Sequence, residues 1–259
     1  MLGLLAACVA APAQAAIKTQ ALEWKDGGTT FAGYLVYDDA GPAARPGLVV
    51  VPNWMGVNDA ALEKAKALAG RDYVVLLADV YGKGVRPKDT EQAGQLSGVL
   101  MQKDRAALRS RVRAAVATLR AQAGKAPLDP ARIGAVGFCF GGSAVLELVR
   151  GGDRLAGVVT LHGVLTTPAP AAAHSVNTPV LVLNGAADSY VSADSIAAFQ
   201  REMDAGDADW QFVDFSGAVH CFAEPDADSP PGCVYNQRAA RRAYRMLRDF
   251  FAERFAAGG

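Results

Sequence analysis

The sequence predicts an α/β fold: one mostly parallel, doubly wound central sheet that is flanked by helices. Short apolar runs alternate with helical patterns, as happens when parallel strands are joined by crossover helices. The runs are continuously apolar, which is typical of central strands that are covered on both faces. The six expected strands lie at residues 47–51, 73–78, 133–138, 158–161, 180–183 and 211–215.

Helical patterns occupy segments between and after these runs. Residues 59–69 open with Asp59, which can cap a helix, and residues 103–121 and about 236–255 repeat apolar side chains every three or four positions. This spacing predicts one buried face for each of the last two helices. The expected buried residues are Leu108, Val112, Ala115, Val116 and Leu119 in the first of these, and Ala240, Ala243, Tyr244, Leu247, Phe250, Phe251 and Phe255 in the second.

Three further segments are expected to be structural only. Residues 21–37 predict an antiparallel edge hairpin around Asp26-Gly27-Gly28, because an Asp-Gly pair favours a tight hairpin turn. The Ala- and Pro-rich residues 166–173 are interpreted as a surface loop. The arginines of the helix at 103–121 are interpreted as its solvated face; they are Arg105, Arg109, Arg111, Arg113 and Arg120.

Size and charge restrict the possible partners. The chain has 259 residues, 51% of them hydrophobic, with 26 Lys and Arg against 26 Asp and Glu. A balanced charge produces no long-range field that would recruit nucleic acid or anionic lipid. No repeat or linker divides the chain. We therefore expect residues 16–259 to form one domain, a monomer or weak homodimer, that acts on a small molecule.

The N-terminal residues 1–15 are interpreted as a signal peptide. An apolar stretch at 2–11 is followed by Ala13-Gln14-Ala15, a small-x-small pattern that signal peptidase accepts. The stretch is too short to span a bilayer. It lacks a basic region, so we expect the natural start to lie upstream. This pattern favours a secreted, periplasmic protein; a lipoprotein anchored through Cys8 and a short buried N-terminal helix are the alternatives.

Three cysteines remain once residues 1–15 are set aside. In an oxidising compartment an odd number of thiols requires one of them to stay unpaired. Cys221 and Cys233 lie on either side of a turn-rich segment, PDADSPPG, that could bring them within bridging distance. This pair is the candidate disulfide and Cys139 the free thiol; the alternative leaves Cys221 and Cys233 unpaired as well.

Cys139 lies at the centre of the pattern Gly137-Phe138-Cys139-Phe140-Gly141. The pattern is typical of a strand-to-helix elbow, in which small residues permit a sharp turn around an exposed nucleophile. An apolar strand precedes it and a helical pattern follows, and a helix N-terminus lowers the pKa of a thiol. We therefore predict a nucleophilic cysteine; the alternative is a buried cysteine beside packing glycines.

Asp188 and His220 complete a nucleophile-acid-histidine order along the chain. Each follows an expected strand, Asp188 after 180–183 and His220 after 211–215. This is the order of a catalytic triad built on an elbow of this kind. We expect His220 to take the thiol proton and later protonate the leaving group, and Asp188 to orient the imidazole.

The backbone N–H groups of Phe140 and Trp54 are the candidates for an oxyanion hole. Phe140 follows the nucleophile at a helix start, and Trp54 follows the first central strand. Bulky side chains could line an apolar pocket around them, although each could equally belong to the core. The pocket candidates are Trp54, Met55, Tyr81, Phe138, Phe140 and Phe222. No residue spacing resembles a metal site, so neither a metal nor a cofactor is expected.

These motifs together resemble the dienelactone hydrolases, the cysteine members of the α/β-hydrolase superfamily. The resemblance rests on five stretches: GFCFGG at 137–142, NGAADSYV at 184–191, AVHCF at 218–222, WMGVN at 54–58 and ADVYG at 78–82. It implies the α/β-hydrolase fold and a cofactor-free esterase. It also implies a triad of Cys139, Asp188 and His220, with Trp54 and Phe140 forming the oxyanion hole.

Several positions depart from the family pattern or have no clear place in it. Asn53 stands where the family has a glutamate that pairs with the cysteine. Lys83 and Glu224 stand where it has two arginines that bind the substrate carboxylate. We expect Lys83 still to attract an anion, as a point charge, whereas Glu224 repels one, and this pattern argues against dienelactone as the substrate. Arg86 is close enough in sequence to replace one of the arginines, so cleavage of dienelactone stays an alternative. His162, at another strand end, is a further pocket candidate, and His174 is expected on an exposed loop.

The sequence thus predicts a hydrolase that cleaves carboxylic esters, thioesters or lactones through an acyl-cysteine intermediate. Two alternatives belong to other classes: a thiol-based redox or sensor protein, and a catalytically silent binding module on the same fold. The disulfide pattern distinguishes the first alternative. A Cys221–Cys233 bond favours hydrolysis, whereas a bond to Cys139 favours redox chemistry.

Overall fold

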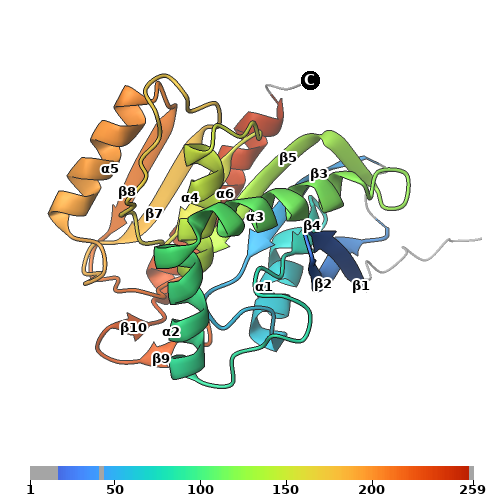
Figure 1. The fold of residues 1–259 in the computed structure, drawn as a ribbon, viewed down its shortest axis with the longest axis horizontal. Helices are drawn as coiled ribbons and strands as arrows, with labels where there is room; N and C mark the ends of the chain where they lie inside the picture. Colours follow the sequence, from blue (N-terminus) through green and yellow to red (C-terminus); the bar gives the residue numbers. More distant parts are fainter. Residues whose placement is uncertain (1–16, 41–43, 257–259) are drawn as a thin grey trace, which may run out of the picture.

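The computed structural model describes residues 17–40 and 44–256, which form an eight-stranded sheet with helices on both faces (Figure 1). The strand order is β1-β2-β4-β3-β5-β6-β7-β8. The strands are β1 (Ile17–Asp26), β2 (Thr29–Asp38), β3 (Arg45–Val51), β4 (Val74–Leu77), β5 (Leu128–Phe138), β6 (Val158–Leu161), β7 (Val180–Gly185) and β8 (Trp210–Phe215). From β4 to β8 every pairing is parallel, and the predicted α/β fold class is confirmed.

The hairpin of β1 and β2 forms one edge of this sheet. Gly27 adopts a left-handed φ of 56° in the turn, as a tight hairpin requires. β2 then pairs antiparallel with β4. At the opposite edge lies β8, which was expected to be a central strand and is instead half exposed, with Gln211 and Asp214 facing solvent. That expectation is wrong because no further strand follows β8 in the sheet.

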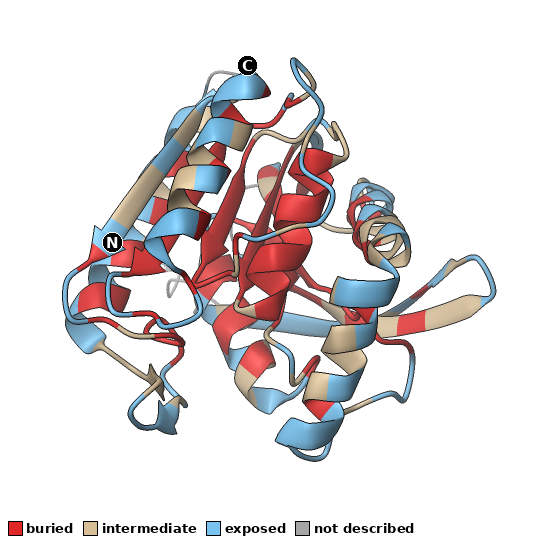
Figure 2. Cartoon of the chain, turned by 60° about the vertical axis from the view of Figure 1, so that its left-hand side comes forward, coloured by how far each residue is buried: buried red, intermediate tan, exposed pale blue. Residues whose placement is uncertain are grey.

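Two helices cover one face of the sheet and three cover the other. α1 (Asp59–Ala69) and α6 (Gln237–Ala256) pack on the first face, and α3 (Arg105–Arg120), α4 (Phe140–Arg150) and α5 (Ala193–Ala205) pack on the second. α4 is buried along its length, and so are the central strands apart from the first half of β5, where residues 129–132 are partly exposed (Figure 2). Leu108, Val112, Ala115, Val116 and Leu119 of α3 are buried as predicted.

Helix ends and helix surfaces differ in part from the sequence prediction. Asn58 caps α1, because its side chain accepts the backbone N–H of Ala61, and Asp59 is instead the first helical residue. α2 (Thr90–Gly98) was not expected; it continues as a short π-helix, η1 (Val99–Lys103), before α3 begins. A small hairpin of β9 (Asp228–Ser229) and β10 (Cys233–Val234) precedes α6.

The arginines of α3 do not form a simple solvated face. Arg105 and Arg109 donate to the two carboxylate oxygens of Glu147, a fully buried residue of α4, at 2.7 and 3.0 Å. Arg111 donates to the carbonyl of Val80. The solvated-face interpretation is wrong for Arg105 and Arg109, because α4 packs against α3 and contributes a buried carboxylate that must be paired. It is also wrong for Arg111, whose guanidinium reaches a backbone carbonyl.

Two other surface expectations agree with the structure, and one lies outside it. Residues 166–173 form a largely exposed loop, and His174 is exposed beside Asp207. None of the helices in the described ranges is both long and apolar enough to cross a membrane. The interpreted signal peptide at 1–15 and the alternative anchor Cys8 lie outside the described residues.

The topology brings the functional candidates to one edge of the sheet. Cys139 follows β5, Asp188 follows β7 and His220 follows β8, each at the carboxyl end of its strand. In open parallel sheets this edge is where ligands bind. The Ala187 N–H donates to the carbonyl of Ala218 at 2.9 Å and so ties the loop of Asp188 to the loop of His220.

Candidate active site

Cys139 occupies the turn between β5 and α4 with a left-handed backbone, φ 53°. For a residue other than glycine this conformation is unfavourable and persists only where the surrounding structure enforces it. Here the enforcing contact is the close packing of strand and helix. A side chain on Gly137 would overlap the carbonyl of Gly141, and one on Gly141 would overlap the carbonyl of Val51. Both glycines of the elbow pattern are therefore required by packing.

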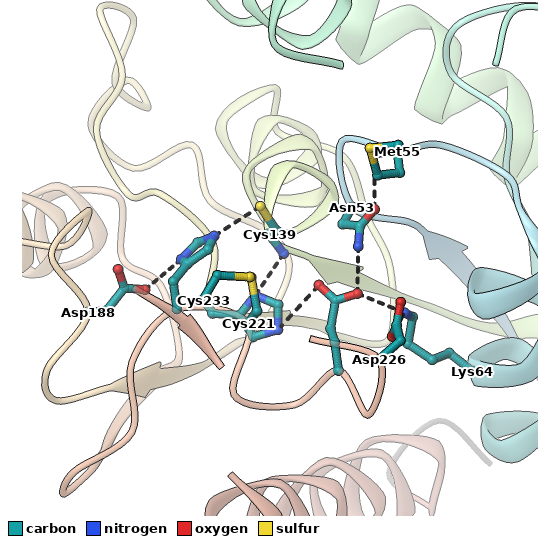
Figure 3. Close-up of a disulfide and its surroundings, with 11 residues drawn as sticks. Asn53, Met55, Lys64, Cys139, Asp188, Cys221, Asp226 and Cys233 are labelled. Atoms are coloured by element: carbon teal, nitrogen blue, oxygen red, sulfur yellow. Dashed lines mark hydrogen bonds and ion pairs between the residues drawn. A yellow bond between two sulfur atoms is a disulfide. The ribbon is translucent and has the colours of Figure 1, made fainter. Parts of the chain in front are cut away.

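A continuous line of hydrogen bonds connects Cys139, His220 and Asp188 (Figure 3). His220 Nε2 lies 3.0 Å from Cys139 Sγ, and His220 Nδ1 lies 2.7 Å from Asp188 Oδ2. The other oxygen, Asp188 Oδ1, accepts the backbone N–H of Tyr190 at 2.9 Å. Asp188 and His220 are each 5% exposed. Cys139, Asp188 and His220, which were predicted from their order along the chain, thus lie in contact in the structure.

The surroundings of His220 favour its charged form. Burial lowers the pKa of this imidazole, but its hydrogen bonds to Asp188 and to Cys139 outweigh burial and raise the pKa to about 10. An imidazolium carries N–H groups on both ring nitrogens, so it can donate to Asp188 and to a Cys139 thiolate at the same time. This geometry places His220 where it can accept a proton from Cys139 while it stays paired with Asp188.

The proposed oxyanion donors lie on either side of Cys139. Phe140 is the first residue of α4, where backbone N–H groups have no partner within the helix. Trp54 lies in the loop after β3, and its carbonyl accepts the Tyr81 hydroxyl at 2.8 Å. The Tyr81 ring stacks on Phe140 at 5.6 Å between centroids, so one buried side chain contacts both donor residues.

Comparison with known proteins identifies the family. The model of the dienelactone hydrolase family matches residues 31–255. The chain belongs to the dienelactone hydrolase family. It is a dienelactone hydrolase-like hydrolase of ester bonds.

Individual relatives span nearly the whole chain. A Salmonella typhimurium protein named "Putative carboxymethylenebutenolidase" is 25% identical over 234 residues, which are 87% of this chain and 84% of that protein. The solved structure of m3DLH is 38% identical with a TM-score of 0.86, and covers 92% of this chain and 98% of its own. A dienelactone hydrolase-like promiscuous phosphotriesterase from metagenomic libraries is 34% identical with a TM-score of 0.83, at the same coverage.

This member of the dienelactone hydrolase family has a cavity of about 510 Å³ beside Cys139. Trp54, Phe140 and His220 line it together with Cys139. Several expected pocket residues do not. Phe138 and Phe222 are fully buried in the core below, Tyr81 lies beneath the oxyanion loop, and Met55 is outside the lining.

The charged positions expected at the pocket also point elsewhere. Lys83 is 55% exposed and pairs with Glu23 of β1 at 2.7 Å. Arg86 lies 3.4 Å from Asp79 and donates to the carbonyl of Ala32. Neither side chain lines the cavity. The expectation that Lys83 attracts a substrate anion is contradicted because the chain after β4 turns this residue toward the β1–β2 hairpin.

Glu224 is paired by other buried groups. Its Oε2 accepts Lys64 Nζ at 2.7 Å and Asn53 Nδ2 at 2.6 Å, and Lys64 also lies 3.1 Å from Asp226 (Figure 3). Asn53 Oδ1 accepts the N–H of Met55 at 3.0 Å. Asn53 and Glu224 therefore brace the oxyanion loop, and they border only a smaller cavity of about 150 Å³ on the other side of Cys139.

His162 lies beneath the nucleophile and outside the cavity lining, contrary to its interpretation as a pocket residue. Its Nδ1 accepts the backbone N–H of Cys139 at 3.1 Å, an N–H that also lies 3.0 Å from the carbonyl of Leu161. Burial, then His220 and Lys64, lower the pKa of His162 well below its ordinary value. A neutral imidazole with Nδ1 as acceptor therefore supports the elbow.

Sequence reasoning missed two parts of the site. Tyr190 lines the cavity and packs its ring edge-on against His220 at 4.9 Å. Another wall comes from α2 and η1, through Gly94, Gly98 and Met101. The signal for Tyr190 was its place two residues after Asp188, within NGAADSYV. α2 gave no such signal, because its short, glycine-containing sequence has little apolar periodicity.

The predicted disulfide between Cys221 and Cys233 is present, with Cα atoms 5.0 Å apart. Among the described residues, Cys139 is the cysteine that remains free. Cys221 follows His220 directly and has a left-handed φ of 59°, and the Val234 N–H donates to the His220 carbonyl at 3.1 Å. The disulfide thus attaches the His220 loop to β10, and both of its cysteines line the main cavity.

Replacing both disulfide cysteines, Cys221→Ser with Cys233→Ser, should lower stability and activity together. Loss of the cross-link is expected to cost about 3 kcal/mol of unfolding free energy, and a loosened His220 loop should lower kcat more than it raises KM. Urea denaturation and ester hydrolysis measure the two effects. Cys139→Ala, which keeps the bond, is the control for stability. Unchanged kcat in the double variant would show that the bond does not position His220.

The raised pKa of His220 predicts a pH-dependent contribution to stability. In the unfolded chain the imidazole titrates near 6.5, and in the folded protein near 10. The stabilisation is therefore complete below pH 6.5 and is lost as pH rises toward 10. The difference in unfolding free energy between the native chain and His220→Asn should shrink across this window. A difference that is constant from pH 6 to pH 10 would contradict the ion pair.

Proposed function

We propose that the chain hydrolyses carboxylic esters, thioesters or lactones through an acyl-cysteine intermediate. The observation that carries the proposal is the hydrogen-bonded line from Asp188 through His220 to Cys139 at the floor of an open cavity. A nucleophile, a base within hydrogen-bond reach and a group that orients the base are the requirements of covalent acyl transfer. Membership of the dienelactone hydrolase family supports this reaction class.

In the first half of the reaction, Cys139 Sγ attacks the carbonyl carbon as a thiolate. The carbonyl π electrons move to oxygen, and the N–H groups of Phe140 and Trp54 stabilise the resulting oxyanion. When the tetrahedral intermediate collapses, the bond to the leaving oxygen or sulfur breaks and His220 Nε2–H supplies its proton. The products of this half are the free alcohol or thiol and an acyl-Cys139.

In the second half, water hydrolyses the acyl-cysteine. His220, now neutral, removes a proton from the water as it attacks the acyl carbon, and the same oxyanion donors act again. Collapse of the second intermediate releases the acid and returns Cys139 as a thiolate beside the imidazolium. Asp188 keeps the imidazole in the required tautomer throughout and stabilises its positive charge.

The disulfide argues against a redox function. A thiol switch needs a resolving cysteine, and the nearest candidate, Cys221, is bonded to Cys233. The catalytically silent binding module differs from the hydrolase in turnover alone. It would leave Cys139 reactive toward alkylating agents while no ester is cleaved.

Cys139→Ala should abolish ester hydrolysis and leave the fold intact. A loss of at least about a thousandfold in kcat is expected, because binding and the oxyanion donors alone leave only residual catalysis. The assay is p-nitrophenyl acetate hydrolysis, with mass spectrometry of the native enzyme during turnover to detect an acetyl group on Cys139. The melting temperature of the variant is the control. Undiminished turnover by the variant would refute the mechanism, and labelling without any turnover would support the binding module.

We also propose that residues 16–259 act as one exported domain in the periplasm. The support is the pattern at residues 1–15 and a disulfide, which forms in oxidising compartments. N-terminal sequencing of the protein from a periplasmic extract should then begin at Ala16. A mature chain that retains residues 1–15 in the cytoplasm would contradict this proposal, and a lipidated Cys8 would support the alternative anchor.

A further inference from the structure

One wall of the main cavity plays no part in the proposed chemistry. It is formed by α2 and η1 and contributes Gly94, Ser97, Gly98, Met101 and Gln102. None of these residues contacts the hydrogen-bonded line of Cys139, His220 and Asp188. Their position on the cavity suggests that they contact a part of the substrate away from the scissile bond.

Gly94 and Gly98 leave this wall open. They are one helical turn apart, so they share one face of α2. Neither has a left-handed backbone, and a Cβ would meet nothing closer than the Trp54 ring, 3.7 Å from Gly94, and the Gln102 amide, 4.0 Å from Gly98. Backbone geometry and packing therefore do not require glycine here. Glycine is also an unfavourable residue inside a helix, so helix stability does not account for it either. What the two glycines provide is empty space beside the cavity.

The side chains around this space are mainly apolar. Trp54 and Tyr190 line the cavity, and both are large aromatic side chains that remain exposed, by 36% and 62%. Met101, Phe140 and Val164 complete the apolar lining. Such a surface gains free energy when an apolar group covers it.

Among the described residues that line this cavity, Arg105 is the permanently charged one, and its charge is already paired with Glu147. Its Nε donates to the Met101 carbonyl at 2.6 Å and its Nη1 to Glu147 at 2.7 Å and Thr167 at 3.3 Å, while Nη2 lies 3.4 Å from the Thr166 carbonyl. A substrate anion at Arg105 would have to compete with Glu147, a fully buried carboxylate. The one permanent cation of the described cavity lining is therefore already neutralised.

We propose that Gly94 and Gly98 are specificity-determining residues, and that the substrate is an uncharged ester whose bulky apolar group occupies the space beside them. This inference rests on the proposed ester hydrolysis at Cys139. The proposed recognition of an apolar group differs from that of an enzyme that recognises a carboxylate on its substrate. The apolar group belongs to the acyl part or to the alcohol part, and matched ester series distinguish the two.

The test is to fill the space with Gly98→Leu and Gly94→Leu. The acyl series compares p-nitrophenyl acetate with the octanoate, and the alcohol series compares ethyl acetate with octyl acetate. Because each buried methylene changes an equilibrium constant by about fourfold, kcat/KM for the affected long ester should fall by at least about tenfold, while the short ester changes less than about twofold. Gln95→Leu, which adds the same side chain on the exposed face of α2, is the matched control.

Stability separates a filled cavity from a damaged helix. Gly98→Leu should raise the melting temperature, because leucine favours the helix, and Gly98→Ala should give a smaller loss of long-ester activity. A second comparison tests the effect of charge with p-nitrophenyl succinate, which is anionic, and the uncharged p-nitrophenyl butyrate. The native enzyme should have the higher kcat/KM for the butyrate.

Two results would overturn the inference: an unchanged ratio of long to short esters in Gly98→Leu, or a native preference for the succinate. Failure of the proposed function looks different. In that case the native chain hydrolyses none of these esters, or Cys139→Ala hydrolyses them equally well, whereas failure of this inference alone leaves acetate turnover dependent on Cys139.

Discussion

The site depends on one close contact, the packing of α4 against β5 at Gly137 and Gly141. That contact holds Cys139 in the left-handed backbone region and points its Sγ out of the sheet toward His220. The positions of the other site residues follow from the central place of β5 in the sheet. Its neighbour β3 supplies the loop of Trp54 on one side, and β6, β7 and β8 on the other side bring Asp188 and His220 to the same edge.

Buried carboxylates around the site are paired, whereas Cys139 and His220 face the main cavity. Glu224 is matched by Lys64, and Glu147 by arginines of α3 and α4. Each pairing avoids the large cost of an unpartnered charge in the interior. Because their partners neutralise them, the carboxylates of Glu224 and Glu147 have little electrostatic influence on the main cavity. Glu224 braces the loop after β3 through Asn53, and the selectivity that we propose for the cavity rests on shape and apolar surface.

Local patterns made much of this predictable. Strands 158–161 and 180–183 were placed closely because buried strands are short apolar runs, and Cys139, Asp188 and His220 stood out because each follows such a run. The disulfide followed from a turn between two cysteines in an odd set. The errors about charged side chains share one cause, which is that a side chain's partner lies far along the chain. The arginines of α3 look solvated until Glu147 is placed against them. α2 was missed for a different reason, because it has too little periodicity to be recognised.

The sequence by itself therefore determined the fold class, the family and the chain order of the three reactive residues, because these depend on periodicity and short motifs. Only the tertiary structure decided what the residues that depart from the family pattern contact. Asn53 meets Glu224 across 171 residues of sequence, and Lys83 turns to Glu23 on the edge hairpin. The physical reason is that a side chain's direction and its pairing are set by packing between distant segments, which no local pattern encodes.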